Sequence, residues 1–401
     1  MSEEKRHRRG NGRGAASGPL DIDRGAASGP LDIDRGAASG PLDIDRGAAS
    51  GPLCVLDAMQ GRHVLVTGVT GFLGKVWLGM LLERVPTLGR ITVVIRSRRG
   101  ETARERFEKI AATSPALRPL RAVHGGRILM WLRERVHVVK GDCSKPLCGL
   151  GEERAREVCA DVDAVVHFAG VTDFMPDPKD ALSSNVRGAV HAADLAALSA
   201  GRRLIHVSTT FVAGRVRGEV AETLTPGVSP NGTRFDAERE LEDLVRVTDE
   251  IDDKPRRTDI VRERAESLGW PNLYTYSKGL AEHLLASRDD VRVTMVRPAI
   301  VECARSYPFE GWNQGINTSG PLVWLFSTSF RHFPSRPDHH FDVVPVDTVA
   351  RGVMLVAAAA LRDEARDVYQ LGSSDTNPLT FGRAIDLTNL AVRRMHSRPD
   401  A

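Results

Sequence analysis

The chain has 401 residues, with 55 basic and 52 acidic side chains and a formal net charge of +3. This near balance argues against a nucleic-acid-binding protein, which would carry a clear basic excess. The five cysteines form no C-x-x-C pair, and no signal-peptide core stands near the start. Because no apolar run approaches the roughly 18–20 residues that span a bilayer, we expect a cytoplasmic protein. The sequence is also compatible with a peripheral contact with a membrane.

The beginning of the chain is repetitive. An eleven-residue unit, R-G-A-A-S-G-P-L-D-I-D, starts at Arg13, recurs unchanged from Arg24 and from Arg35, and begins again at Arg46. Each copy carries two glycines and a proline, which exclude a continuous helix. We therefore expect residues 1–58 to form a disordered tail that is dispensable for chemistry.

From residue 61, short apolar runs alternate with segments of helical spacing. Runs rich in Val, Ile and Leu predict strands, and apolar residues spaced three or four apart predict helices. The expected strands are His63–Thr67, Ile91–Ile95, Arg135–Lys140, Ala164–Phe168, Leu204–Val207 and Val291–Val296, and the expected helices are Phe72–Arg84, Thr102–Ala112 and Asp180–Ser199. This alternation is typical of an α/β fold, a Rossmann-type doubly wound parallel sheet with helices on both faces.

Two long inserts interrupt the alternation. The densely charged insert at about 235–268 is expected to be helical, and residues 299–341 contain Trp312, Trp324, Phe326 and Phe330 in a Gly- and Pro-rich setting typical of a substrate lid. We therefore expect an NAD(P)-binding Rossmann domain over 59–298. The expected partner of that domain is a smaller C-terminal substrate subdomain or lid region over 299–401, with C-terminal helices.

A glycine-rich turn, Thr67-Gly68-Val69-Thr70-Gly71-Phe72-Leu73-Gly74, joins the first strand to the first helix. Gly68 can adopt the turn, Gly71 lets the backbone approach a pyrophosphate, and Gly74 lets the helix pack on the sheet. Phosphate would then lie at the helix N-terminus, held by backbone N–H groups. A turn without a ligand is the alternative. The same segment brings three further residues to the expected cofactor site: Thr70, Phe72 and Leu73.

The residues that follow the second strand predict which cofactor binds. They read Ile95-Arg96-Ser97-Arg98-Arg99, with no acid to accept the ribose 2′-hydroxyl of NAD. Guanidinium groups suit a 2′-phosphate by charge and geometry, so we expect NADPH, bound by Arg96 first and Arg99 second. A solvated basic loop is the alternative reading.

Later strands end in further candidate residues. Asp142, followed by Cys143, can accept the adenine amino group, and Ala169 and Gly170 place small residues beside the cofactor. Another strand ends in Ser208-Thr209, which brings hydroxyls to the edge where doubly wound sheets bind ligands.

Tyr274 is the only one of the four tyrosines with a lysine four residues later, Lys278. Residues i and i+4 share a helix face, and a cation near a phenol lowers its pKa from roughly 10. Tyr274 could then protonate a carbonyl oxygen as hydride reaches the carbon. Thr209, or Ser208, would bond the developing oxyanion. The histidines lack the spacing of a metal site.

Together these motifs resemble the extended short-chain dehydrogenase/reductases and, within them, the fatty acyl-CoA reductases, over about 61–370. Markers of the superfamily are Thr67-Gly68-x-x-Gly71-Phe72-Leu73-Gly74, His167-x-Ala169, Asn185-Val186-x-Gly188, Ser208-Thr209, Tyr274-x-x-x-Lys278 and Arg297-Pro298. Narrower markers include Gly141-Asp142-x-Ser144-x-Pro146-x-x-Gly149-Leu150, Trp270-Pro271-Asn272-x-Tyr274-Thr275-Tyr276-Ser277-Lys278 and Pro308-Phe309-x-Gly311-Trp312. One departure is Asn313-Gln314 after Trp312, where the family usually has an acidic residue and an asparagine.

The resemblance implies NADPH-dependent reduction of a long-chain acyl-CoA. Hydride attack gives a hemithioacetal, which expels coenzyme A to leave an aldehyde, and many members continue to a primary alcohol. It also implies that Thr209, Tyr274 and Lys278 are the catalytic trio and that Asn185 and Pro298 lie near the cofactor.

Two other functions stay open. One is a sugar-nucleotide epimerase or dehydratase of the same superfamily, and the other is a nucleotide-sensing scaffold without catalysis. The sequence leaves open the acyl chain length, the end product and the natural length of the chain. It also does not fix the oligomeric state, and a homodimer is compatible with the sequence.

Overall fold

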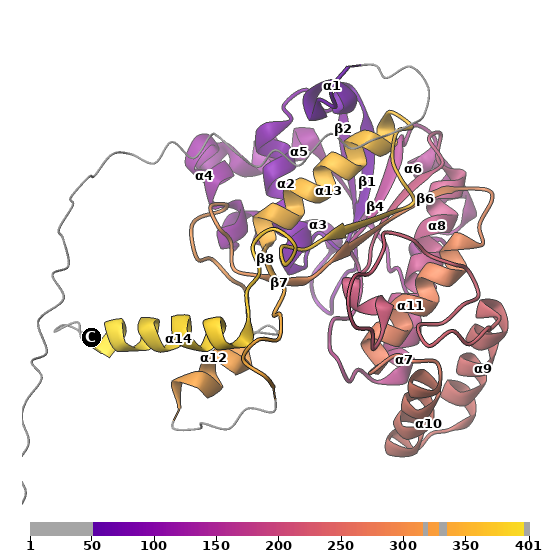
Figure 1. Ribbon diagram of the computed structural model, residues 1–401. Coiled ribbons are helices and arrows are strands. Elements are labelled where there is room, and N and C mark those ends of the chain that lie inside the picture. The colour runs from indigo at the N-terminus through magenta and orange to yellow at the C-terminus, as the bar shows by residue number, and fades with distance from the viewer. Residues whose placement is uncertain (1–50, 316–319, 329–334, 397–401) are drawn as a thin grey trace, which may run out of the picture. The chain divides into compact units, whose positions relative to one another are not determined.

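The computed structural model describes residues 51–315, 320–328 and 335–396, so the repeats and Phe330 lie outside the described part. Its centre is a sheet of parallel strands in the order β3-β2-β1-β4-β5-β6-β9 (Figure 1). The strands are β1 (His63–Thr67), β2 (Arg90–Ile95), β3 (Val136–Lys140), β4 (Ala164–His167), β5 (Arg203–Val207), β6 (Arg292–Pro298) and β9 (Val368–Leu371). The predicted doubly wound parallel sheet is confirmed.

The six predicted strands are confirmed to within about two residues at either end. The edge strand β9 was not predicted, because its residues after Val368 are only half-buried and one of them is the polar Gln370. A separate parallel pair is formed by β7 (Ile300–Glu302) and β8 (Val343–Pro345).

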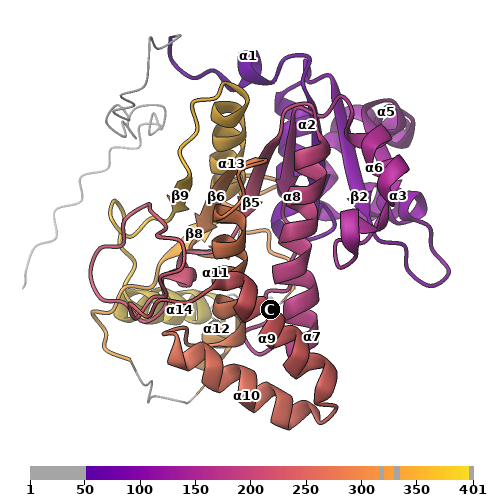
Figure 2. The ribbon, with the colours of Figure 1, turned by 90° about the vertical axis from the view of Figure 1, so that its right-hand side faces the viewer.

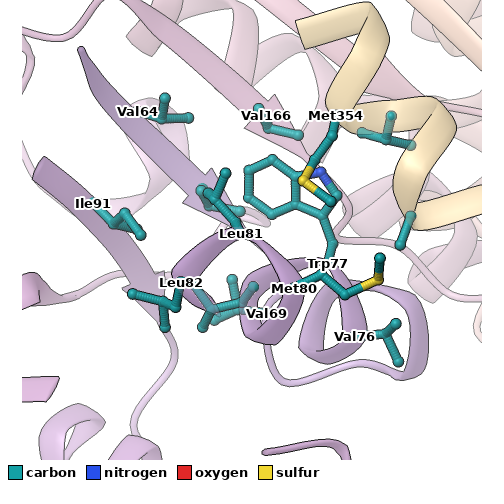
Figure 3. Close-up of a cluster of buried hydrophobic side chains, with 14 of the residues drawn as sticks. Val64, Val69, Val76, Trp77, Met80, Leu81, Leu82, Ile91, Val166 and Met354 are labelled. Carbon is teal, nitrogen blue, oxygen red and sulfur yellow. The ribbon is translucent and has the colours of Figure 1, made fainter. Parts of the chain in front are cut away.

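One face of the sheet is covered by α2 (Phe72–Arg84) and α13 (Val346–Leu361). Trp77 of α2 is fully buried and packs among Val64, Val166 and Met354, which joins the two helices to the strands (Figure 3). The short helix α1 (Val55–Met59) contacts α13 and buries Ala58. Residues 55–58 are therefore helical, which corrects the expectation of a tail running to residue 58. Three further helices accompany this face: α3 (Ala103–Thr113), α4 (Arg118–His124) and α5 (Ile128–Arg135).

The opposite face carries α6 (Glu152–Cys159), α8 (Gly188–Leu198) and α11 (Leu273–Ala286), the last two side by side in Figure 2. The single helix predicted before β5 is interrupted. It consists of α7 (Pro178–Ala181), a π-helical turn over Leu182–Arg187, and α8.

The charged insert is helical, as predicted, and forms α9 (Ala237–Glu250) and α10 (Lys254–Ser267). The hydroxyl of Tyr276 on α11 donates to the buried carboxylate of Glu240, which also accepts from Arg264 Nε at 2.8 Å. This buried network fixes the insert against α11. The remaining helices are α12 (Gly320–Ser327) and α14 (Phe381–His396). Within the described ranges, none of the helices combines the length and apolarity needed to cross a bilayer.

Candidate active site

The glycine turn between β1 and α2 can pack this closely only because two of its residues lack a Cβ. Gly68 has φ +77°, and a Cβ there would lie 2.4 Å from the backbone nitrogen of Ala169. A Cβ on Gly74 would lie 2.5 Å from the carbonyl oxygen of Gly68. The turn is therefore pressed against the end of β4 and leads directly into Gly71, the N-cap of α2. Free N–H groups and the helix dipole at this point favour a phosphate.

The arginines expected to select the cofactor follow β2, and the side chains of Arg96 and Arg99 are exposed. A third arginine, which the sequence reasoning missed, ties this loop to the glycine turn. Arg106 of α3 donates to the carbonyl oxygen of Arg96 at 2.7 Å and to Thr70 Oγ1 at 3.3 Å. The T-x-x-E capping box that begins α3 at Thr102 was the available signal, because it fixes which residues lie on the first turn. Burial, together with nearby arginines, lowers the pKa of Arg106.

Asp142 lies at the carboxyl end of β3, in a loop that is tightly closed. Its Oδ1 accepts from the backbone N–H of Ser144 at 3.1 Å and from the hydroxyl at 2.8 Å, and its own N–H donates to the carbonyl of Cys148 at 2.6 Å. The adjacent Cys143 is half-buried, and its Sγ lies 3.5 Å from Cys148 Sγ.

Tyr274 lies on the first turn of α11, which begins after Asn272, whose side chain accepts from the Thr275 N–H at 2.9 Å. The phenol lies beside the buried Thr209, and its ring contacts that of Phe174 at 6.0 Å between centroids. Desolvation raises the pKa of Tyr274, and the side chain of Thr209 lowers it by a smaller amount. The net direction differs from the sequence expectation, in which Lys278 lowers this pKa.

Lys278 is buried one turn further along α11, and its Nζ donates to the carbonyl of Val207 at 3.0 Å. Desolvation lowers the pKa of Lys278 to about 8, and Glu282 opposes that shift. The rings of His167 and His206 are stacked, with 5.4 Å between their centroids, and both are fully buried. Desolvation lowers the pKa of His167 to about 3, so this ring is neutral and bonds Thr67 Oγ1 through Nδ1 at 2.7 Å.

Asn185, in the π-helical turn, joins the end of β4 to α11. Its Oδ1 accepts from the Val171 N–H at 2.7 Å, and its Nδ2 donates to Val171 O at 3.1 Å and to Ser277 Oγ at 2.9 Å. A Cβ on Gly170 would lie 2.9 Å from Asn185 Oδ1 and 3.2 Å from Lys278 Nζ. The structure therefore brings Asn185, Gly170 and Lys278 together. The sequence analysis did not single out Ser277 for this contact, because its partner Asn185 lies far away in the chain.

Two expected residues occupy neighbouring strand ends. Ser208 follows β5 and is buried, and within the described part of the chain its hydroxyl makes no hydrogen bond. Pro298 is the buried last residue of β6 and pairs with Leu371 of β9.

The first part of the expected lid region packs against the start of α2, next to the glycine turn. Trp312 is buried, and its ring lies 5.3 Å from that of Phe72. Lys75, one turn into α2, donates to the side-chain oxygen of Gln314, and desolvation lowers its pKa to about 8. Gln314 stands in the segment where the sequence departs from the family pattern, so a buried lysine meets a neutral amide here.

Fold and site together define a Rossmann-type, dinucleotide-binding reductase domain. Residues 66–353 match the family of NAD-binding domains described as male sterility protein, and the chain belongs to that family. It is 29% identical over 366 residues to the chloroplastic fatty acyl-CoA reductase 2 of Arabidopsis thaliana, and the match covers 86% of this chain and 59% of that protein. It is 28% identical to the alcohol-forming fatty acyl-CoA reductase of Simmondsia chinensis, over 81% of this chain and 69% of that protein.

Solved structures with the same fold include reductase domains of biosynthetic assembly lines. The terminal R domain of the myxalamid PKS-NRPS pathway superposes with a TM-score of 0.55 at 21% identity, over 85% of this chain and 71% of that one. The reductase domain of a nonribosomal peptide synthetase from Mycobacterium tuberculosis gives 0.52 at 22% identity, over 82% and 71%. These matches confirm the expected Rossmann-type fold.

Proposed function

We propose that this chain is an NADPH-dependent reductase of long-chain acyl-CoA thioesters, yielding a fatty aldehyde or, after a second reduction, a primary alcohol. The observation that carries the proposal is the placement of Tyr274 beside the buried Thr209, one turn from the buried Lys278. Family membership and the relatives named above as acyl-CoA reductases support the choice of substrate.

The residues at the glycine turn suit a dinucleotide. Gly68 lets the turn pack tightly against the end of β4, and α2 begins with unbonded N–H groups. Arg96, Arg99 and Arg106 supply positive charge for a 2′-phosphate, since nothing acidic stands at the end of β2. Asp142 would accept the adenine amino group. Gly170, Asn185 and Pro298 would line the opposite end.

When bound, NADPH would supply a hydride to the thioester carbonyl carbon. Tyr274 would then protonate the carbonyl oxygen, and its raised pKa keeps the phenol in its acid form at neutral pH. Thr209 would hydrogen-bond the developing oxyanion. Lys278, charged below about pH 8, would stabilise the phenolate that remains. This role differs from the one expected from sequence, since the lysine acts after proton transfer rather than by ionising the tyrosine beforehand.

An apolar rim beside Tyr274 supports an acyl substrate. Phe174 is 43% exposed, Met175 is 51% exposed and Phe211 is 41% exposed. Phe174 contacts the ring of Tyr274, and the N–H of Phe211 donates to Thr209 Oγ1 at 3.3 Å. Exposed apolar side chains gathered at a polar site are typical of a surface that binds an apolar ligand. We propose that residues 299–401 complete this substrate site and that 59–298 bind the cofactor.

Incubation of the purified chain with NADPH and a series of acyl-CoA thioesters tests the proposal. We expect cofactor oxidation and an aldehyde or alcohol product that chromatography identifies, with the long-chain thioesters turned over fastest. An epimerase or dehydratase retains its cofactor through turnover, so the absence of NADPH oxidation with every thioester would contradict the proposal.

A further inference from the structure

Two thiols face each other in the loop that follows β3. Cys143 Sγ and Cys148 Sγ are 3.5 Å apart. Cys148 is fully buried, whereas Cys143 is half-buried. Because the sulfurs of a disulfide lie about 2.05 Å apart, a shift of roughly 1.5 Å would bring these two into bonding distance.

The backbone of this loop is held in an unusual conformation. Leu147 has φ +50° and Cys148 has φ +53°, both in the left-handed region that residues other than glycine rarely adopt. Such conformations cost on the order of 1–3 kcal/mol each and persist where the surroundings enforce them. Here the bond from the Asp142 N–H to the Cys148 carbonyl folds the chain back and keeps the two thiols together.

The two thiols differ in reactivity. Hydrogen bonds, first from Cys148 and then from the hydroxyl of Thr67, lower the pKa of Cys143 against the effect of burial. The pKa of Cys148 is raised by its hydrogen bond with Cys143 and by burial. Because thiolates are the nucleophiles in thiol oxidation, Cys143 is suited to react first and Cys148 to resolve the product.

We propose that Cys143 and Cys148 form a redox-active dithiol that closes to a disulfide and thereby weakens cofactor binding. A hydroperoxide is the oxidant that the chemistry requires. The Cys143 thiolate attacks the peroxide oxygen, giving a sulfenic acid and releasing hydroxide. The Cys148 sulfur then bonds to that sulfur and expels its oxygen as water. With hydrogen peroxide, two thiols lose two electrons and two protons, and the peroxide becomes two waters.

The link to the cofactor follows from the position of the two thiols beside Asp142. Cys143 follows Asp142 in the chain, and the Asp142 N–H donates to the carbonyl of Cys148 at 2.6 Å. Closure of the disulfide would draw Cys143 towards Cys148 and strain the backbone of this loop. It would also displace Asp142, the expected partner of the adenine. This step rests on the cofactor site proposed above.

The test uses the full chain with Cys54→Ser and Cys303→Ser, which removes one half-buried and one exposed thiol elsewhere. After treatment with hydrogen peroxide, peptide mass spectrometry locates the disulfide. Tryptophan fluorescence then measures the NADPH dissociation constant before oxidation, after it and after re-reduction with dithiothreitol. We expect a Cys143–Cys148 disulfide and a rise in Kd of about tenfold, equivalent to ~1.4 kcal/mol, reversed on reduction.

Two variants sharpen the result. Cys148→Ser should abolish both the disulfide and the reversible change in Kd. Cys159→Ser, which removes another buried thiol of the same core, should preserve both. Failure to form the Cys143–Cys148 disulfide, or its formation with an unchanged Kd, would overturn the inference. If the reduced protein did not bind NADPH, the proposed function and the control of binding would both fail. Formation of the disulfide would still be tested independently, by peptide mass spectrometry.

Discussion

The two ends of the candidate site are built differently. Around Tyr274 the functional groups are buried and bonded to backbone, as the contacts of Lys278 with Val207 and of Asn185 with Val171 illustrate. After β2, by contrast, Arg96 and Arg99 are exposed. Proton transfer needs fixed geometry in a desolvated setting, whereas attraction of a phosphate needs mainly positive charge. Changes at the first end should therefore affect the chemical step, and changes at the second should affect cofactor affinity.

The largest effect is expected at Tyr274. Tyr274→Phe removes the proton donor and keeps the ring, so kcat should fall by about 10²–10⁴-fold, the usual contribution of a general acid. Steady-state kinetics with an acyl-CoA measures the loss. NADPH affinity should be unchanged, because the arginines lie at the other end of the candidate site. A Kd that rose along with the fall in kcat would break the contrast between the two ends.

Lys75 tests whether the buried end extends into α2. Its pKa is about 8 in the folded chain and about 10.5 in the unfolded chain, so the unfolded state binds more protons between these values. Wild-type stability should rise with pH across this window, relative to Lys75→Met, by about 3 kcal/mol in total. Urea unfolding of both proteins from about pH 7 to about pH 10 measures the difference. Parallel pH profiles would contradict a desolvated lysine.

Asn185 should prove to be a structural support of the buried end. Asn185→Ala leaves the N–H and carbonyl of Val171 without their side-chain partner, which should lower the free energy of unfolding by about 1–3 kcal/mol. Urea unfolding measures it. Ser183→Ala is a matched control in the same π-helical turn, because the Ser183 hydroxyl donates to a backbone carbonyl near the surface. Equal losses in both variants would show that the turn, and not the asparagine network, matters.

The smallest effect belongs to the exposed end. Arg96→Ala should weaken NADPH binding about tenfold and NADH binding far less, because one charge-assisted contact to the 2′-phosphate is lost. Arg106→Ala should act in the same direction. Arg104→Ala on the same helix, whose side chain points towards Glu108, should leave both cofactors unaffected. Equal loss of NADPH and NADH would place recognition of the 2′-phosphate elsewhere.

The sequence was most predictive where one local signal determines the structure. Apolar runs located six strands, and the glycine turn emerged at the end of β1, because burial on both faces of a parallel sheet leaves few alternatives. The edge strand β9 carried a weaker signal, since it is only half-buried beyond Val368.

Contacts between distant segments were not predictable in the same way. Arg106 of α3 contacts Thr70 of the glycine turn, and Ser277 contacts Asn185 across 92 positions of the chain. The direction of the Tyr274 pKa also escaped prediction, because desolvation depends on what surrounds the ring, whereas i,i+4 spacing reports only its helical neighbour. Sequence patterns therefore propose candidate residues, whereas the tertiary structure determines the contacts that hold each of them.

The transfer of deuterium from NADPH labelled at its transferable position is the most direct test of the central claim. With an acyl-CoA substrate, we expect the label to reach the former thioester carbon of the aldehyde or alcohol, and we expect Tyr274→Phe nearly to abolish this transfer. Cofactor oxidation that left no deuterium at that carbon, or wild-type transfer by the phenylalanine variant, would contradict the claim.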